Sequence, residues 1–112
     1  MTTMPEQAAG AAAVVRLTTV RARPGAYWEL QAAAQANAAD AVVATGCLSA
    51  EACQGSAEDE VVVVSRWRTA RDLEAFLAWH ESAAHQGLAP YAAEPPHSQH
   101  LRVSGPEVTL SD

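Results

Sequence analysis

Four histidines are the side chains whose chemistry could be exploited most directly: His80, His85, His97 and His100. On a continuous helix, a spacing of five residues does not bring His80 and His85 onto one metal ion, and the four together do not form a recognisable zinc-binding set. We therefore predict no metal site. Imidazole titrates near neutrality, so acid–base chemistry is the functional alternative to a surface or structural role for each histidine.

Aromatic and amide side chains form the second candidate group. Flat walls for a pocket would come from Trp28, Trp67, Phe76 and Trp79. The hydroxyl of Tyr91 would orient a phenolic or quinone oxygen, although a tyrosine also suits a subunit interface. Asn37 lies on the apolar face of an Ala-rich segment, where its amide is either a pocket donor or turned toward solvent. Trp67 has an equally simple alternative role as a core anchor.

Composition restricts the classes of partner. The chain has 112 residues and a formal charge of −6, and its seven basic residues are all Arg and form no run. This balance argues against nucleic acid or an anionic membrane as the main partner. The longest aliphatic run, residues 61–64, is far shorter than a membrane span. The N-terminus lacks a basic segment typical of a signal peptide, and two cysteines make no disulfide framework, so we expect a cytoplasmic protein.

Periodicity predicts the elements that must position these side chains. Strands are expected at 13–23, 47–54, 60–68 and 97–103, and helices at 26–44 and from residue 70 to about 79, with a short second piece at 80–89. Thr69 is a favourable N-cap, and Pro90, Pro95 and Pro96 should enforce a loop. The order is β-α-β-β-α-β, which predicts an α+β ferredoxin-like fold: a four-stranded antiparallel sheet with helices on one face. Residues 13–104 form this domain, between a disordered tail at 1–12 and a C-terminal tail at 105–112.

One face of such a sheet is left uncovered by helices. Strand alternation places Trp67, Ser65 and Val63 on the helix-covered face. The opposite face would carry Val15, Leu17, Val62 and Val64. A chain with few bulky apolar residues is not expected to leave these side chains in water. We therefore predict a homodimer in which two sheets pack face to face.

Several short motifs follow one another at characteristic spacing: RPG after the first strand, TGCL opening the second, VSRW closing the third, then LEAFLAWHESAAH and LAPYAAEPP. In this order they resemble the antibiotic biosynthesis monooxygenase family of dimeric α/β barrels. The resemblance covers roughly residues 13–104.

The resemblance implies roles for particular positions, and this chain departs from several of them. Cofactor-free oxygenases of the family carry a Trp at the position of Trp67, but their Asn four residues earlier is replaced by Val63. Their Tyr and Arg fall near Leu73 and Gln86. Haem-degrading relatives use residues at the positions of Thr18, Phe76 and His85, of which only the histidine is retained here, so haem oxygenation is not expected. Family spacing places His85 at the pocket mouth as the first candidate base, with His80 second.

The sequence therefore predicts a cofactor-independent monooxygenase that uses molecular oxygen on an electron-rich polycyclic aromatic, such as an anthrone or hydroquinone, in natural-product biosynthesis. The predicted catalytic residues are His85, Trp67 and Tyr91. The predicted substrate-binding residues are Trp28, Asn37, Val63, Ser65, Phe76, Trp79 and His80. Two alternatives stay open: a cyclase or isomerase that uses the same pocket without oxygen, and a non-catalytic ligand-binding barrel.

Overall fold

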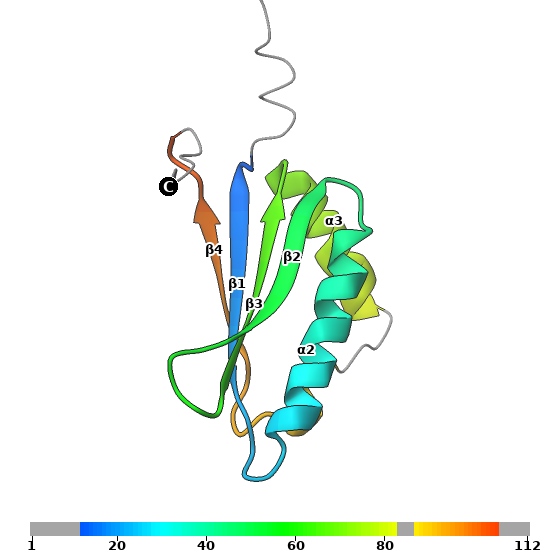
Figure 1. The fold of residues 1–112 in the computed structure, drawn as a ribbon. Helices are drawn as coiled ribbons and strands as arrows, with labels where there is room; N and C mark the ends of the chain where they lie inside the picture. Colours follow the sequence, from blue (N-terminus) through cyan, green and yellow to red (C-terminus); the bar gives the residue numbers. More distant parts are fainter. Residues whose placement is uncertain (1–11, 83–86, 106–112) are drawn as a thin grey trace, which may run out of the picture.

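The computed structural model describes residues 12–82 and 87–105 (Figure 1). Its elements run in the order β1 (Val14–Arg21), α2 (Tyr27–Val42), β2 (Cys47–Gln54), β3 (Glu60–Trp67), α3 (Ala70–Ser82), the 3-10 helix η1 (Ala89–Tyr91) and β4 (His97–Arg102). The predicted order β-α-β-β-α-β is confirmed. The predicted terminal tails lie, apart from residues 12 and 105, outside the described residues.

The four strands form one antiparallel sheet in the order β2-β3-β1-β4. The central pair is in continuous register, with Val14 opposite Trp67 at one end and Arg21 opposite Glu60 at the other. Beside it, β4 pairs with β1, so that Ser98 lies opposite Thr18. This is the ferredoxin-like α+β arrangement predicted from the element order.

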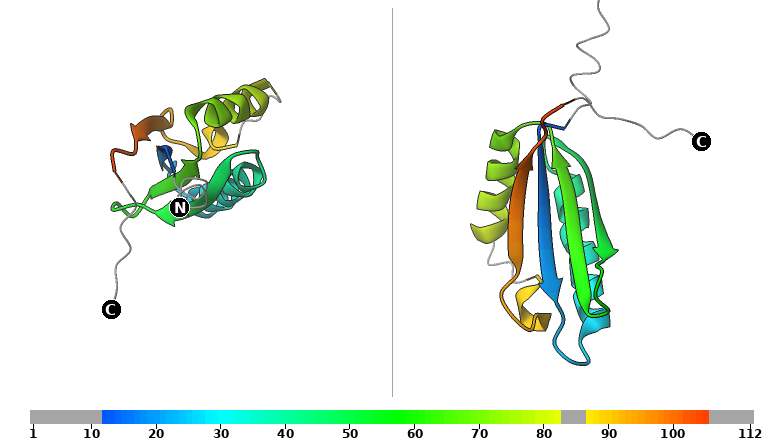
Figure 2. Two further views of the ribbon diagram at one scale, coloured as in Figure 1. Left: turned by 90° about the horizontal axis from the view of Figure 1, so that it is seen from above. Right: turned by 90° about the vertical axis from the view of Figure 1, so that its left-hand side faces the viewer.

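Both helices lie on the same side of the sheet (Figure 2). In the right-hand view of Figure 2, α2 lies behind the β2–β3 half of the sheet and α3 lies behind the β4 half. The opposite sheet face is not covered by a helix. It carries Val15, Leu17, Val62 and Val64, all partly exposed in the single chain, as the strand alternation predicts.

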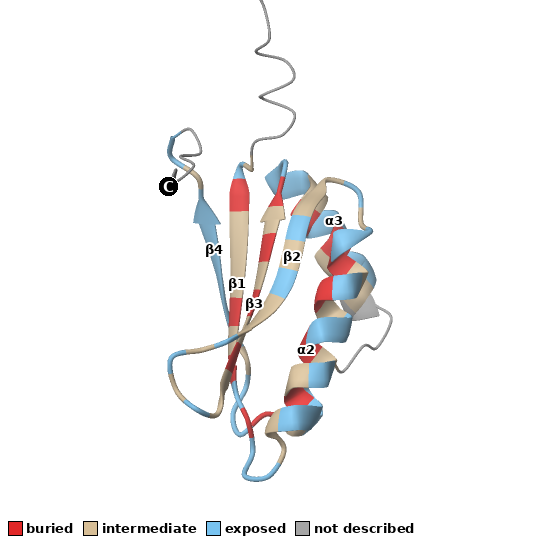
Figure 3. Cartoon of the chain, viewed as in Figure 1, coloured by how far each residue is buried: buried red, intermediate tan, exposed pale blue. Residues whose placement is uncertain are grey.

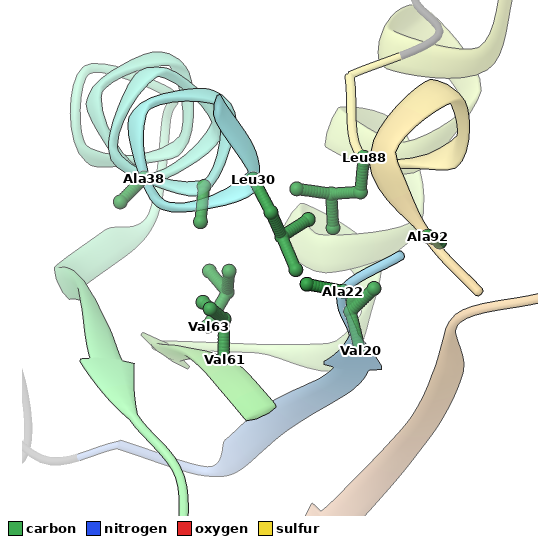
Figure 4. Close-up of a cluster of buried hydrophobic side chains, with 9 residues drawn as sticks. Val20, Ala22, Leu30, Ala38, Val61, Val63, Leu88 and Ala92 are labelled. Atoms are coloured by element: carbon green, nitrogen blue, oxygen red, sulfur yellow. The ribbon is translucent and has the colours of Figure 1, made fainter. Parts of the chain in front are cut away.

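The core lies between α2 and the central strands (Figures 3 and 4). Leu30, Ala34 and Ala38 of α2 are buried against Val61 and Val63 of β3. They recur every four residues, and the alanines are small enough to let the helix approach the sheet closely. A second cluster joins α3 to the other end of the sheet; its buried members are Val14, Ala41, Trp67, Leu73 and Phe76.

The second helix differs from its prediction. It begins as expected, because the backbone N–H of Asp72 donates to Thr69 Oγ1 at 3.0 Å and so completes an N-cap. However, α3 continues through His80 to Ser82, so the predicted end near Trp79 is wrong. No Gly or Pro interrupts this stretch, and the helix has no local reason to stop there. Pro90 lies in the first turn of η1, where its missing N–H removes no helical hydrogen bond.

Within residues 12–82 and 87–105, no helix is long and apolar enough to cross a membrane.

Candidate functional site

A cavity of about 210 Å³ lies between the helical layer and the β1–β4 half of the sheet. On the helical side it is lined by Asn37 of α2 and by Phe76, Leu77 and His80 of α3. Gly87, Leu88, Ala89 and Pro96, from the segment containing η1, close one side. The cavity thus combines aliphatic and aromatic walls with an amide and an imidazole, the mixture typical of small-molecule sites.

The floor of the cavity is polar and is formed by two adjacent strands. Arg16 and Thr18 of β1 and Ser98 of β4 line it. Arg16 Nη2 donates to Ser98 Oγ at 3.1 Å, and Arg16 Nε donates to His100 Nε2 at 3.2 Å. The hydroxyls of Thr18 and Ser98 share a hydrogen bond of 2.9 Å. Because alternate residues of a strand share a face, these side chains form one row of polar groups beneath the helices.

The His100 imidazole acts as a hydrogen-bond acceptor in this row. Partial burial, and then the positive charge of Arg16, lower the pKa of His100 below its ordinary value. A neutral imidazole accepts a hydrogen bond at the nitrogen that carries no proton. His100 can therefore accept from the guanidinium of Arg16 near neutral pH without a repulsive charge between them.

His80 reaches the cavity from the last turns of α3. Its side chain is only 14% exposed, and its Nε2 lies 3.9 Å from Asp40 Oδ2 on α2. The imidazole ring packs against Phe76, with the ring centroids 5.1 Å apart. A half-exposed carboxylate at this distance can balance positive charge that develops on the imidazole. Of the two histidines predicted as the base, His80 is described, whereas His85 lies outside the described residues.

Three of the predicted site residues line the cavity: Asn37, Phe76 and His80. Three others lie on β3 in the packed interior, because Trp67, Ser65 and Val63 are all buried. The indole N–H of Trp67 donates to Ser65 Oγ at 2.8 Å. The catalytic role predicted for Trp67 stays a prediction, but its position has the features of a core anchor with one satisfied polar atom.

Three further predicted residues, Trp28, Trp79 and Tyr91, lie away from the cavity. Trp28 is 76% exposed on the outer side of α2 and Trp79 is 56% exposed on α3. Tyr91, in η1, is half-buried and packs against the main core cluster. None of these three lines the cavity. Their predicted roles stay predictions.

The floor residues Arg16 and Ser98 were not singled out from the sequence, although a signal for Arg16 was present. Val14, Thr18 and Val20 alternate toward the helices, so Arg16 must share their inward face. A charged residue at an inward strand position is unusual and often marks a site. The partners on β4 had no comparable signal, because that strand is polar throughout.

Among the described residues, no three His, Cys, Asp or Glu side chains gather closely enough to hold a metal ion. Cys47 and Cys53 are free thiols, and burial raises the pKa of Cys47.

The sequence model of the antibiotic biosynthesis monooxygenase family matches residues 13–90, which include the helical wall of the cavity and Arg16 and Thr18 of its floor. The chain belongs to this family. No curated protein sequence matches this family member.

Solved structures share the fold at low sequence identity. A conserved protein from Methanosarcina mazei Go1 superposes with a TM-score of 0.74 at 11% identity, covering 86% of this chain and 97% of its own. A protein from Mycobacterium tuberculosis superposes with a TM-score of 0.69 at 20% identity, covering 88% of this chain and 98% of its own. A protein from Pseudomonas aeruginosa superposes with a TM-score of 0.69 at 18% identity, covering 85% of this chain and 97% of its own. At these identities the likeness establishes the fold alone.

Proposed function

We propose that this family member is a cofactor-independent monooxygenase that oxidises a small electron-rich aromatic compound with molecular oxygen. The observation that supports this proposal is the cavity in which an imidazole, an amide and an aromatic ring from the two helices face one small space. Such a site can remove a proton and stabilise the resulting oxyanion.

The reaction needs no flavin or metal, because the substrate itself supplies the electrons. With an anthrone, a base removes one proton of the methylene group and leaves an enolate. The enolate gives one electron to oxygen, and the two radicals combine to form a carbon–oxygen bond and a peroxide. Loss of the second methylene proton breaks the oxygen–oxygen bond. The products are a quinone carbonyl and one molecule of water, so one oxygen atom enters each.

His80 is the described residue placed to act as the base. Its imidazole lines the cavity, and the carboxylate of Asp40 at 3.9 Å balances the charge that follows proton uptake. Asn37 is the proposed donor to the enolate oxygen, since its amide N–H groups come from the neighbouring helix on the same cavity wall. Phe76 is the flat surface against which the substrate ring packs.

The size of the cavity favours a small substrate. Pockets for drug-sized ligands occupy about 300–1,000 Å³, and the cavity of about 210 Å³ is below that range. A substrate with two or three fused rings therefore suits the single chain better than a larger polycyclic compound.

A second function, a cyclase or isomerase acting in the same pocket, is favoured by one specific observation. Val63 and Leu73 are buried in the core. They occupy or adjoin positions where the cofactor-free oxygenases that the sequence resembles carry polar residues. They cannot donate to a substrate oxygen. Proton removal by His80 and enolate stabilisation by Asn37 would still catalyse an isomerisation or ring closure without oxygen.

We also propose that the functional unit is a homodimer formed through the uncovered sheet face. Val15, Leu17, Val62 and Val64 form an apolar strip there, and strand pairing places Leu101 beside Val15. Two such faces packed together would remove the strip from water. Free, partly buried thiols suit the reducing cytoplasm, where we expect the protein to act.

Oxygen uptake with an anthrone tests the enzymatic proposal. Wild-type protein should consume one oxygen molecule per quinone formed, and His80→Ala should lower the rate by roughly a hundredfold or more, as for loss of a general base. Glu74→Ala, an exposed change on the same helix, is the control and should leave the rate unchanged. Unaltered turnover by His80→Ala would remove His80 as the base. Product formed without oxygen uptake would establish the cyclase instead, and no turnover at all would refute both.

A further inference from the structure

A second cavity, the interhelix groove, lies between the end of α2 and the first turns of α3. It shares a wall with the first cavity, because Phe76 lines both. Its other lining residues are Asp40, Val43, Ala44, Thr45, Asp72, Ala75 and Trp79. Small-molecule pockets occupy about 300–1,000 Å³, and the volume of about 340 Å³ in this groove falls within that range. The interhelix groove is therefore large enough to hold a ligand of its own.

The walls of the interhelix groove are largely apolar and partly open to water. Trp79 is 56% exposed, and Val43, which directly follows α2, is 83% exposed. An exposed indole beside aliphatic side chains is a surface on which a flat apolar molecule packs. Both helices lie on one side of the sheet (Figure 2). Packing of two sheets through their uncovered faces would thus leave the groove accessible.

The charged side chains of the interhelix groove are carboxylates. Among the described residues that line it, Asp40 and Asp72 are charged and none is basic. Asp72 lies in the first turn of α3, where the positive end of the helix stabilises a carboxylate. Asp40 lies in the last turn of α2, where the negative end of the helix disfavours one, and α2 has no basic residue in that turn. A cation bound at Asp40 would therefore be favoured by the carboxylate and by the helix end together.

Asp40 keeps the capacity to bind such a cation. Its side chain is 40% exposed, and its Oδ2 lies 3.9 Å from His80 Nε2, which is longer than a hydrogen bond. The two oxygens of a carboxylate offer about four lone-pair sites. The contact with His80 thus leaves Asp40 able to accept hydrogen bonds from a group in the groove.

We propose that the interhelix groove is a second ligand site that binds a small aromatic amine, with its ammonium group at Asp40 and its ring against Trp79. The carboxylates favour a cation over a neutral or anionic compound. The apolar walls favour an ammonium group that carries a ring over a bare inorganic cation, which would gain nothing from them. This site goes beyond the proposed oxidation, and neither depends on the other.

Calorimetric titration of the full-length protein with tryptamine and tryptophol at pH 7.5 tests the proposal. Both probes carry an ethyl chain on an indole, and they differ in having an ammonium or a hydroxyl group at its end. Wild-type protein should bind tryptamine roughly fivefold or more tightly than tryptophol, as expected for an ion pair with a half-exposed carboxylate at a helix C-terminus. Indole-3-propionate, which carries a negative charge on a similar body, should bind more weakly than tryptophol.

Four variants locate the site. Asp40→Asn should remove the preference for tryptamine and leave the affinity for tryptophol unchanged, whereas Asp40→Glu should keep part of the preference. Asp72→Asn is the matched control, because it removes the same charge from the same groove, and it should lower the affinity for tryptamine by less than about twofold. Trp79→Ala should weaken the binding of both probes.

A further control separates the two cavities. Asn37 lines the first cavity and not the interhelix groove, so Asn37→Ala should change the affinity for neither probe. The near-ultraviolet circular dichroism of the aspartate variants and of Asn37→Ala should match that of the wild type. If Asp40→Asn fails to fold, a reduced preference in Asp40→Glu carries the test.

Several outcomes would overturn the proposal. They are equal affinity of the wild type for tryptamine and tryptophol, a loss in Asp72→Asn as large as in Asp40→Asn, unchanged binding by Trp79→Ala, and no binding at millimolar concentration. A loss in Asn37→Ala without one in Trp79→Ala would place the amine in the first cavity and would also overturn it. Oxygen uptake plays no part in these measurements, so a failure of the oxygenase proposal leaves them unaffected.

Discussion

Arg16 and Trp67 face the same side of the sheet but have opposite environments. Both lie on the face that the helices cover, yet Trp67 is fully buried among Leu73 and Phe76, while Arg16 borders the cavity. Strand alternation determines the face of each side chain. Whether that side chain meets packed core or open space depends on where each helix rests, and this is a tertiary property.

At the residue level, the role of Trp67 as an anchor leads to a stability prediction. Its indole N–H has Ser65 Oγ as hydrogen-bond acceptor at 2.8 Å in the buried core. Ser65→Ala leaves this donor unsatisfied and should lower the free energy of unfolding by about 1–3 kcal/mol. In the double variant Trp67→Phe/Ser65→Ala the donor is removed as well. The loss of unfolding free energy in the double variant should therefore be smaller than the sum of the losses in Ser65→Ala and Trp67→Phe.

Urea denaturation of the wild type, Ser65→Ala, Trp67→Phe and the double variant measures this coupling. Fully additive losses would contradict the hydrogen bond as a contributor to stability. Oxygen uptake provides the functional comparison: if Trp67 is an anchor and not a catalytic residue, Trp67→Phe should retain most of the wild-type rate.

At the level of elements, most of the fold could be predicted from the sequence, because strand alternation and helical spacing are local patterns. β2 was predicted to the residue, and both helices were predicted at the right places. The end of α3 was not, since the segment around His80 has no Gly or Pro to show a boundary. The cavity floor was also missed, because it depends on the pairing of β4 with β1, and the polar β4 sequence does not indicate which residues face inward.

The turn after α2 leads to a second stability prediction. Gly46 has a φ of +83°, and a Cβ built there would collide with the side chain of Asp72 near the start of α3. Gly25, after β1, has a similar φ of +80° but open space around it. Gly46→Ala should therefore cost both backbone strain and displacement of Asp72, whereas Gly25→Ala should cost the strain alone, about 1 kcal/mol.

Thermal unfolding of the two variants isolates the collision. Gly46→Ala should have the lower melting temperature, and its α3 should be perturbed because Asp72 lies in its first turn. Equal melting temperatures would show that Asp72 moves aside at no cost, and that the approach of the two helices does not depend on glycine there.

At the level of the whole molecule, the described part of the chain has two layers, the sheet and the helices. A third layer would be needed to bury the apolar side chains on the uncovered sheet face. The helices bury Val61 and Val63 of β3, but the alternate residues Val62 and Val64 stay partly exposed. Four consecutive valines are typical of a strand covered on both faces. A second copy of the sheet is the cover that the proposed dimer would supply, and it would also stiffen the β1–β4 half on which the cavity floor depends.

A charge placed on the uncovered face tests this arrangement. Leu101 is 45% exposed on the edge strand β4, so Leu101→Glu should be tolerated by the single chain. In the dimer the same change would bury an unpaired carboxylate in each subunit, which should weaken association by roughly a hundredfold. The matched control is Val43→Glu, because Val43 is an exposed apolar side chain in the helical layer.

Light scattering after size-exclusion chromatography measures the mass of each protein at micromolar concentration. Wild type and Val43→Glu should have the mass of two chains, and Leu101→Glu that of one. A monomeric wild type would refute the dimer, and a dimer broken by Val43→Glu but not by Leu101→Glu would move the interface to the helices. If monomeric Leu101→Glu also loses oxygen uptake with the anthrone, then the cavity floor depends on the second sheet, since Leu101 itself faces away from the cavity on the strand that supplies Ser98.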